Sequence, residues 1–289
     1  MPYPPQHLDL YIKRSILFTI IFVAYCLNKA DAQKMSDDPL RIDSMTMVSA
    51  KAKLNALSIE PFQKASYTDG ASVIPYRFML PEAMHAGEKY PLVITLHNSS
   101  RVGDDNVSQL EPLARIWLLS GARSGYKAFV LAPQFKSRSS VYTADSAAGV
   151  LTSSPSADVK ALYSLTKELE HDHPEIDTRR VYVVGYSMGA STAQNLVAMD
   201  PHHFAAVVSI AAVPDMRHAD AFKKLPIWLV HGQLDADNPY NGSVALYKAI
   251  AGNRSAKFVS YQYLTHNNIM VPFLNAEVIP GWLFKQVKR

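Results

Sequence analysis

The chain has 289 residues, of which 48% are hydrophobic, so it is long enough to bury the core of one ordinary domain. Its 29 Lys and Arg against 25 Asp and Glu give a net charge of +4, without runs of one sign. This balance argues against nucleic acid as a partner. We find no internal repeat and no sign of a second folded domain.

The first 32 residues have the pattern of a cleavable secretory signal peptide. Lys13 and Arg14 precede an apolar run over residues 16–27, and Ala30-Asp31-Ala32 supplies small residues at the spacing that signal peptidase requires. We therefore expect cleavage after Ala32 and a secreted or periplasmic protein. A membrane anchor is the alternative, but twelve apolar residues are fewer than the ~20 that span a bilayer.

Cys26 raises a second alternative, a lipoprotein, but the residue before it is a tyrosine where lipobox sequences carry a small residue. Cleavage after Ala32 removes this cysteine, which is the only one in the chain, so the mature protein would have neither disulfides nor thiolate metal ligands. We expect no cofactor, no metal and no stable membrane insertion after cleavage. His171-Asp172-His173 resembles a metal pair, but it closes a predicted surface helix without a third ligand nearby.

The rest of the chain is predicted to alternate between strands and helices. Residues 33–57 are polar and charge-mixed, which predicts a mobile leader ending in a short helix, with a single domain over residues 58–289. Two strand-like runs flank an Asp-Gly pair, a strong hairpin signal. The predicted strands cover residues 62–67, 74–80, 92–96, 128–132, 181–184, 205–210, 226–230 and 257–263. The predicted helices cover residues 107–120, 156–171, 243–251 and 276–287, with one more directly after residue 187.

This alternation predicts an α/β fold: a mainly parallel central sheet opened by an antiparallel hairpin, with helices on both faces. Residues 137–155 are rich in Ser, Ala and Thr and have no clear periodicity, so we expect an exposed loop there.

Residues 180–193, R-V-Y-V-V-G-Y-S-M-G-A-S-T-A, are the stretch that points to chemistry. They contain G-x-S-x-G at residues 185–189, after a strand suited to full burial and before a helix-forming run. The two glycines let backbone approach a serine that is held in a strained conformation with its hydroxyl exposed. This is the context of the nucleophile elbow of α/β-hydrolases, and it predicts Ser187 as a nucleophile.

A nucleophilic serine needs an imidazole base and a carboxylate that orients the base, and in this fold they follow in the chain order Ser, acid, His. Asp235 lies just past the predicted strand at residues 226–230, and Asp237 is its competitor. His266 follows the last predicted strand. The predicted catalytic residues are therefore Ser187, Asp235 and His266, while His97 and His231 are expected to have structural or loop-ordering roles.

Serine attack also requires two NH donors for the oxygen that becomes negative. The backbone NH of Met188 is the first candidate, because it begins the helix after the elbow and gains from the helix dipole. The second donor should come from the loop after residue 96, from Asn98 or Ser99, with Asn98 as the first choice.

From about residue 76 to the C terminus, the chain resembles secreted α/β-hydrolases known as predicted peptidases and as polyhydroxybutyrate-depolymerase-like and feruloyl-esterase-like esterases. The resemblance is carried by Y-R-F-M-L-P at 76–81, K-Y-P-L-V at 89–93, F-V-L-A-P-Q at 129–134, G-Y-S-M-G at 185–189, H-G-Q-L-D at 231–235 and H-N at 266–267. It implies the α/β-hydrolase fold and maps the family's triad onto Ser187, Asp235 and His266.

The chain departs from this family at two places. Where the family has His-Gly-x-Gly-Glu-Arg-Gly, residues 97–103 read H-N-S-S-R-V-G, so both early glycines are absent. If the loop needs a positive φ, Asn98 can adopt it more easily than Ser100. The tryptophan that often follows the His-Asn-Ser motif is also missing, with Asn268-Ile269-Met270 in its place, which predicts a different acyl pocket.

The sequence therefore predicts an exported serine hydrolase that cleaves carboxylic esters, with acyl groups on plant polysaccharide as one candidate. Its partner would be a small-molecule or polysaccharide-linked ester. Two alternatives stay open: a serine peptidase of the same fold, and a non-catalytic hydrolase fold that binds saccharide or a protein, which the lost loop glycines motivate.

Overall fold

The structure is a computed structural model that describes residues 33–288 of the chain. The predicted signal peptide, residues 1–32, lies outside the described residues, and so does Cys26. Within residues 33–288, no helix combines the length and the apolar character needed to cross a membrane.

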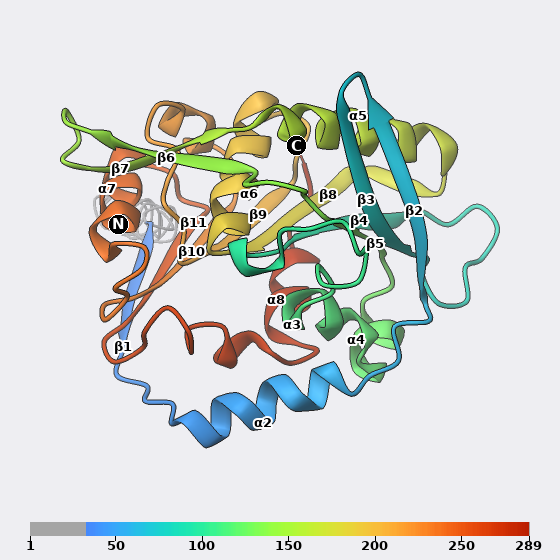
Figure 1. Ribbon diagram of the computed structural model, residues 1–289, viewed down its shortest axis with the longest axis horizontal. Helices are drawn as coiled ribbons and strands as arrows, with labels where there is room; N and C mark the ends of the chain where they lie inside the picture. Colours follow the sequence, from blue (N-terminus) through green and yellow to red (C-terminus); the bar gives the residue numbers. More distant parts are fainter. Residues whose placement is uncertain (1–32, 289) are drawn as a thin grey trace, which may run out of the picture. The chain divides into compact units, whose positions relative to one another are not determined.

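A nine-stranded sheet forms the centre of the domain (Figure 1). Its strands are β1 (Lys34–Asp38), β2 (Phe62–Asp69), β3 (Ser72–Met79), β4 (Tyr90–Leu96), β5 (Phe129–Pro133), β8 (Ile176–Tyr186), β9 (Ala206–Ile210), β10 (Ile227–Gly232) and β11 (Ala256–Tyr261). Their order in the sheet is β1-β11-β10-β9-β8-β4-β5-β3-β2. Only β3 runs opposite to the other eight strands, and the β2–β3 hairpin forms one edge of the sheet.

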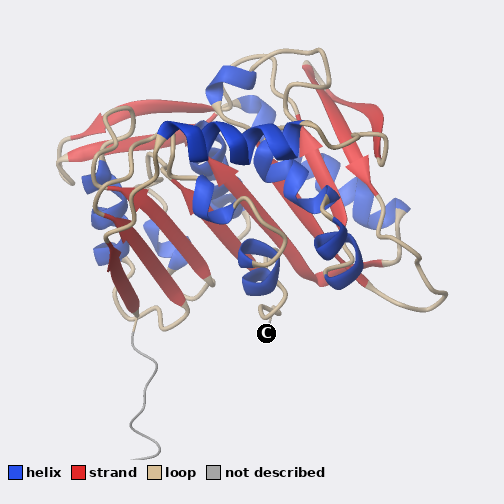
Figure 2. Cartoon of the chain, turned by 90° about the horizontal axis from the view of Figure 1, so that it is seen from below, coloured by secondary structure: helices blue, strands red, loops and turns tan. Residues whose placement is uncertain are grey.

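Helices cover both faces of this sheet (Figures 1 and 2). One face carries α5 (Ala157–Asp172), α6 (Met188–Met199) and α7 (Tyr240–Ala249). The other carries α2 (Ser44–Asn55), α3 (Pro112–Arg115), α4 (Ser120–Gly125) and α8 (Val278–Leu283). Short 3-10 helices are η1 (Ser99–Arg101), η2 (Ile116–Leu118), η3 (Ala219–Phe222) and η4 (Val271–Phe273).

The central strands are buried on both faces because their side chains alternate between two apolar layers. In β8, Val181 and Val183 pack in the layer of α5, α6 and α7, whereas Tyr182 and Val184 pack in the layer of α2, α3 and α8. All four side chains are fully buried. The two layers confirm the predicted α/β class, with its mainly parallel sheet, its opening hairpin and helices on both faces.

Residues 33–57, predicted as a mobile leader ending in a short helix, contain that helix as α2 but also a strand of the central sheet. Their first part, β1, pairs in parallel with β11 at the edge of the sheet, from Lys34 opposite Lys257 to Asp38 opposite Tyr261. Their second part, α2, packs Leu54 into the apolar layer on its face. Polarity misled the prediction because an edge strand joins the sheet through backbone hydrogen bonds, and its side chains can stay in solvent.

The helix predicted over residues 107–120 is broken into short pieces. It starts only at Pro112, and Glu111 before it has extended backbone with φ of −81° and ψ of 176°, as the residue before a proline prefers. Leu119 is also extended, with φ of −61° and ψ of 137°, and separates η2 from α4. The last predicted helix is shorter than expected as well, because α8 ends at Leu283.

The exposed loop predicted over residues 137–155 is instead a two-stranded antiparallel sheet, β6 (Ser140–Asp145) and β7 (Val150–Pro155). Buried hydroxyls fix it to α6: Ser139 and Ser140 lie 2.7 and 3.0 Å from the Thr192 hydroxyl, and Ser140 donates to Asn195 at 2.7 Å. Serines that look like loop residues in the sequence are here satisfied polar groups in an interior contact.

Gly189 lets α6 approach the end of β4 closely. A Cβ at this position would lie 2.1 Å from the carbonyl oxygen of Leu96 and 2.7 Å from that of His97. Because both contacts are with backbone, no side-chain movement could relieve them.

We predict that Gly189→Ala lowers the free energy of unfolding by about 3 kcal/mol or more, since the methyl group must push α6 away from β4. Gly125→Ala is the matched control, because a Cβ at Gly125 would meet no atom within 4 Å. Urea unfolding of both variants checks this prediction, and equal stabilities would contradict the close approach.

Candidate active site

Ser187 lies at the sharp turn between β8 and α6, at the carboxyl edge of the sheet. Its φ of 58° and ψ of −124° are values that residues other than glycine rarely adopt. The turn is held because the Ser187 NH donates to the Ile210 carbonyl at 2.9 Å and the Ser187 carbonyl accepts from α6. The predicted elbow geometry is therefore present, with the hydroxyl directed at the sheet edge.

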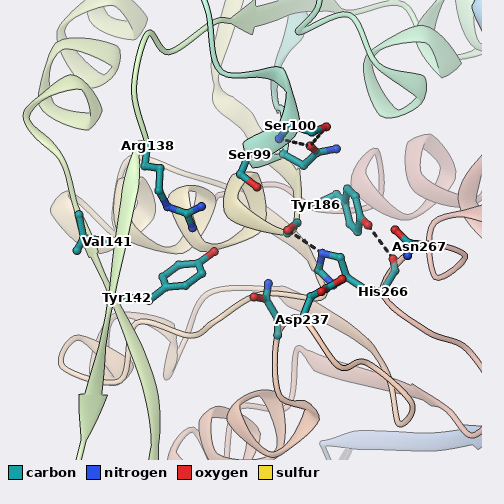
Figure 3. A pocket seen from close by; sticks show the side chains of 12 residues that line it. Ser99, Ser100, Arg138, Val141, Tyr142, Tyr186, Asp237, His266 and Asn267 are labelled. Atoms are coloured by element: carbon teal, nitrogen blue, oxygen red, sulfur yellow. Dashed lines mark hydrogen bonds between the residues drawn. The ribbon is translucent and has the colours of Figure 1, made fainter.

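The structure brings the three predicted catalytic side chains together. His266, beyond β11, places Nε2 2.8 Å from Ser187 Oγ and Nδ1 2.7 Å from Asp235 Oδ2 (Figure 3). All three residues are less than 10% exposed. With Nδ1 protonated and donating to the carboxylate, Nε2 is left as the acceptor for the serine proton.

Asp235, not Asp237, is the carboxylate that contacts the imidazole of His266. Its Oδ1 accepts backbone NH groups from Asp237 and Asn238 at 2.9 and 2.8 Å, while Oδ2 faces His266 and, at 3.2 Å, His231 Nε2. Burial raises the pKa of Asp235, but these hydrogen bonds outweigh it and hold the pKa well below its usual range. The carboxylate is therefore ionised and fixed in orientation, whereas Asp237 is exposed.

Tyr186 positions His266 from the side. The Tyr186 hydroxyl donates to the His266 backbone carbonyl at 2.7 Å, and the two rings lie 5.1 Å apart at an angle of 35°. Burial raises the pKa of this phenol, so it stays a neutral donor. In the sequence, Tyr186 is recognisable only as the variable position of G-x-S-x-G.

The other two strand-end histidines order loops around the site. His97 Nε2 accepts the Phe135 NH at 3.0 Å and Nδ1 donates to the Asn98 carbonyl at 2.8 Å, while burial lowers the pKa of His97 to about 4. His231 is fully buried between the Ser243 hydroxyl and the Asn238 carbonyl. The contacts of these two histidines fit the predicted loop-ordering roles.

Hydrogen-bond partners distinguish the backbone NH groups that were predicted for the oxyanion hole. The NH of Met188, at the first position of α6, has no acceptor among the described residues, as a donor for substrate requires. The NH of Asn98 donates instead to Glu111 Oε1 at 3.1 Å. Ser99 has the NH in this loop without an acceptor within residues 33–288, so the geometry favours Ser99, the sequence's second choice, over Asn98.

Glu111 holds the loop that carries these residues. Its carboxylate accepts both the backbone NH and the side-chain amide of Asn98, the latter at 2.7 Å, and the Asn98 amide oxygen accepts from the Ser100 NH at 2.8 Å. Burial raises the pKa of Glu111 to about 7, against the lowering effect of the Asn98 hydrogen bond and the Arg101 charge.

This network explains how the loop forms without the two glycines of the resembled family. Asn98 has extended backbone with φ of −77°, and none of residues 98–100 has a positive φ. A left-handed residue is therefore not required at this position, because the Asn98 side chain caps η1 and fixes the turn instead.

A cavity of about 750 Å³ opens above the serine (Figure 3). Arg138, Val141 and Tyr142 form one wall, and Tyr186, His266 and Asn267 form another. The first wall was not predicted from the sequence, because its residues fall within the segment expected to be a loop. The only available signal was the Val-Tyr-Thr run at residues 141–143, which favours a strand.

One group of acids and histidines within residues 33–288 could in principle hold a cation. Single ligand atoms of Asp235, Asp237 and His266 all lie within 4.8 Å of one another. However, His266 Nδ1 and the Asp235 carboxylate already face each other at 2.7 Å, and His266 Nε2 faces Ser187. A triad explains these atoms better than a metal site does.

Comparisons with known proteins agree with this fold. Residues 154–229 match the model of the prolyl oligopeptidase family. A thermostable esterase of known structure is 27% identical with a TM-score of 0.70, over 79% of this chain and 64% of that chain. No curated protein matches this chain.

Two more distant structures show the fold alone. An acylaminoacyl peptidase from Pyrococcus horikoshii is 14% identical with a TM-score of 0.56, over 79% of this chain and 42% of that one. A ferulic acid esterase is 12% identical with a TM-score of 0.55, over 77% and 97%. This chain thus spans less than two thirds of the esterase and peptidase chains matched first. It has the α/β-hydrolase fold, with esterase and peptidase structures among its neighbours, and the narrower group named from its sequence stays a prediction.

The raised pKa of Glu111 predicts a pH-dependent stability. The folded protein binds a proton at Glu111 up to about pH 7, whereas the unfolded chain releases it near pH 4.5. The free energy of unfolding should therefore fall as pH rises from 5 to 8, by about 2 to 3 kcal/mol from this residue. Glu111→Gln removes the titrating group and should flatten that fall.

Urea unfolding of the wild type and of Glu111→Gln at pH 5 and pH 8 measures the difference. Glu82→Gln is the control, because Glu82 is exposed and should leave the wild-type dependence unchanged. An equal fall in the wild type and in Glu111→Gln would contradict the assignment.

Proposed function

We propose that the protein is an exported serine hydrolase that cleaves carboxylic esters through an acyl-enzyme on Ser187. The observation that carries the proposal is the hydrogen-bonded series from Ser187 to His266 to Asp235, with distances of 2.8 and 2.7 Å. The signal-like sequence of residues 1–32 supports export, and the 27% identical thermostable esterase supports ester chemistry.

The reaction would begin when His266 Nε2 takes the proton of Ser187 Oγ as this oxygen attacks the ester carbonyl carbon. Asp235, held ionised by four donors, stabilises the imidazolium and keeps its Nδ1 proton in place. His266 then gives the proton to the alcohol oxygen as the bond from carbon to that oxygen breaks. A water molecule then attacks the acyl-enzyme carbonyl and gives a proton to His266. His266 returns this proton to Ser187 Oγ as the carboxylic acid leaves.

Negative charge develops on the carbonyl oxygen during attack, and the NH groups of Met188 and Ser99 would bind it. Met188 stands at the positive end of the α6 dipole, and both residues carry an NH without a partner inside the described chain. Because these groups are fixed before substrate arrives, they need no rearrangement at the transition state.

We predict that Ser187→Ala abolishes turnover of p-nitrophenyl acetate and that Asp235→Asn lowers kcat by about 10³- to 10⁴-fold, because the amide favours the wrong tautomer of His266. Asp237→Asn is the matched control, two residues away on the same loop, and should stay within a few-fold of the wild type. Steady-state kinetics of the three purified variants checks this.

Circular dichroism and thermal unfolding show whether each variant is folded. Unchanged turnover in folded Ser187→Ala removes Ser187 from the mechanism. A larger loss of kcat in Asp237→Asn than in Asp235→Asn would show that Asp237, and not Asp235, orients His266.

A peptidase is the second candidate, and the match of residues 154–229 to the prolyl oligopeptidase family favours it. An amide leaving group needs protonation by His266 in the same way, so the triad does not discriminate between the two substrates. Comparison of kcat/KM on acyl esters and on acyl p-nitroanilides with the same acyl group separates them. Preference for the anilides would replace the esterase assignment.

A further inference from the structure

Arg138 stands in the wall of the cavity without a countercharge. It lies in the segment between β5 and β6 and lines the same cavity as Ser187 and His266. Its guanidinium carbon lies 4.9 Å from the centre of the Tyr142 ring. No ion pair joins it to a carboxylate of residues 33–288, and the Tyr142 hydroxyl is a hydrogen-bond partner of this exposed side chain.

The Tyr142 ring supports the Arg138 guanidinium and is itself held in place by a hydrogen bond. The Tyr142 hydroxyl lies 3.1 Å from the hydroxyl of Ser191 on α6, four residues after the nucleophile. Burial raises the pKa of the phenol, so it remains neutral and does not supply the missing negative charge. A guanidinium has five NH donors, so contact with one tyrosine leaves donors for a planar anion.

Neither acidic group of the site forms an ion pair with Arg138. The Asp235 carboxylate already accepts from two imidazoles and two backbone NH groups. Asp237 follows it on the same loop, with a carboxylate oxygen within 4.8 Å of the Asp235 and His266 ligand atoms. Figure 3 shows Arg138 and Tyr142 on one side of the cavity, and His266, Asn267 and Asp237 on the other.

The position of Arg138 relative to His266 decides which part of a substrate would contact Arg138. The alcohol oxygen must lie against His266 Nε2, which protonates it, so the alcohol occupies the side of His266 and Asn267. The acyl group is left with the wall of Arg138 and Tyr142. A cavity of about 750 Å³ has room for an acyl chain that ends in a charged group.

We propose that Arg138 binds a carboxylate at the far end of the acyl group, so that the enzyme prefers half-esters of dicarboxylic acids over neutral esters. This inference rests on the proposed ester hydrolysis at Ser187. A guanidinium and a carboxylate match in a planar, two-bond geometry, and this pair would place the ester carbonyl relative to Ser187 as well as select the substrate.

The test compares p-nitrophenyl half-esters of adipic and pimelic acid with their methyl-capped neutral counterparts. In the wild type, kcat/KM should be about tenfold higher for the charged member of each pair, the size of one partly solvated guanidinium–carboxylate contact. Arg138→Gln should lose this preference while keeping turnover of the neutral esters. Added salt should weaken the preference in the wild type only.

Lys136→Gln is the matched control: it removes one positive charge from the same segment, and Lys136 is exposed like Arg138 but does not line the cavity. It should keep the wild-type preference. An equal loss in Lys136→Gln and Arg138→Gln would reduce the effect to general surface charge and overturn the proposal.

Two other results also overturn it. A wild type without preference for the charged acyl group, but with turnover that Ser187→Ala abolishes, rejects the role of Arg138 and leaves the proposed function intact. A stronger preference for esters whose alcohol carries the charge, lost in Arg138→Gln, assigns the guanidinium to the leaving-group side. Turnover that persists in Ser187→Ala rejects the proposed function itself.

Discussion

The site depends on the backbone of Ser187, which is held at a φ of 58° where a side chain is strained. The surrounding sheet imposes this conformation: β8 is buried on both faces, and α6 starts within one residue of its end. Gly185 and Gly189 make the turn possible, since a Cβ on either would lie about 2 Å from backbone oxygen. The fold thus stabilises a local strain that exposes one hydroxyl at the carboxyl edge of the sheet.

Around this turn, buried polar contacts fix segments that have little regular structure. Glu111 holds the Asn98 loop, and the serines before and within β6 hold the hairpin against α6. Each contact places a wall of the same cavity, so the cavity owes its shape to polar groups satisfied within the protein. The loop glycines of the resembled family can be absent because the Asn98 side chain caps η1 and fixes the turn.

The parts that the sequence predicts well are those with a strong local pattern. The apolar run before Gly185 specifies a buried strand, and Asp235 and His266 are found because each directly follows such a strand. The hairpin of β6 and β7, the strand β1 and the role of Glu111 were missed for a common reason. Their side chains are polar, and whether a polar side chain meets solvent or a buried partner is decided by residues distant in the chain, such as Thr192 for Ser139. The choice between the NH of Asn98 and that of Ser99 likewise depends on Glu111, thirteen residues away from Asn98.

The central claim is that Ser187 is an activated nucleophile with its base and oxyanion donors already in place. Labelling of the protein lacking residues 1–32 with a fluorophosphonate probe, followed by intact mass and peptide mapping, tests it most directly. The account predicts a single adduct, on Ser187, because only this hydroxyl has both an imidazole acceptor at 2.8 Å and unoccupied NH groups beside it among the described residues. Folded protein that takes up no label, or carries it on another residue, would contradict the account.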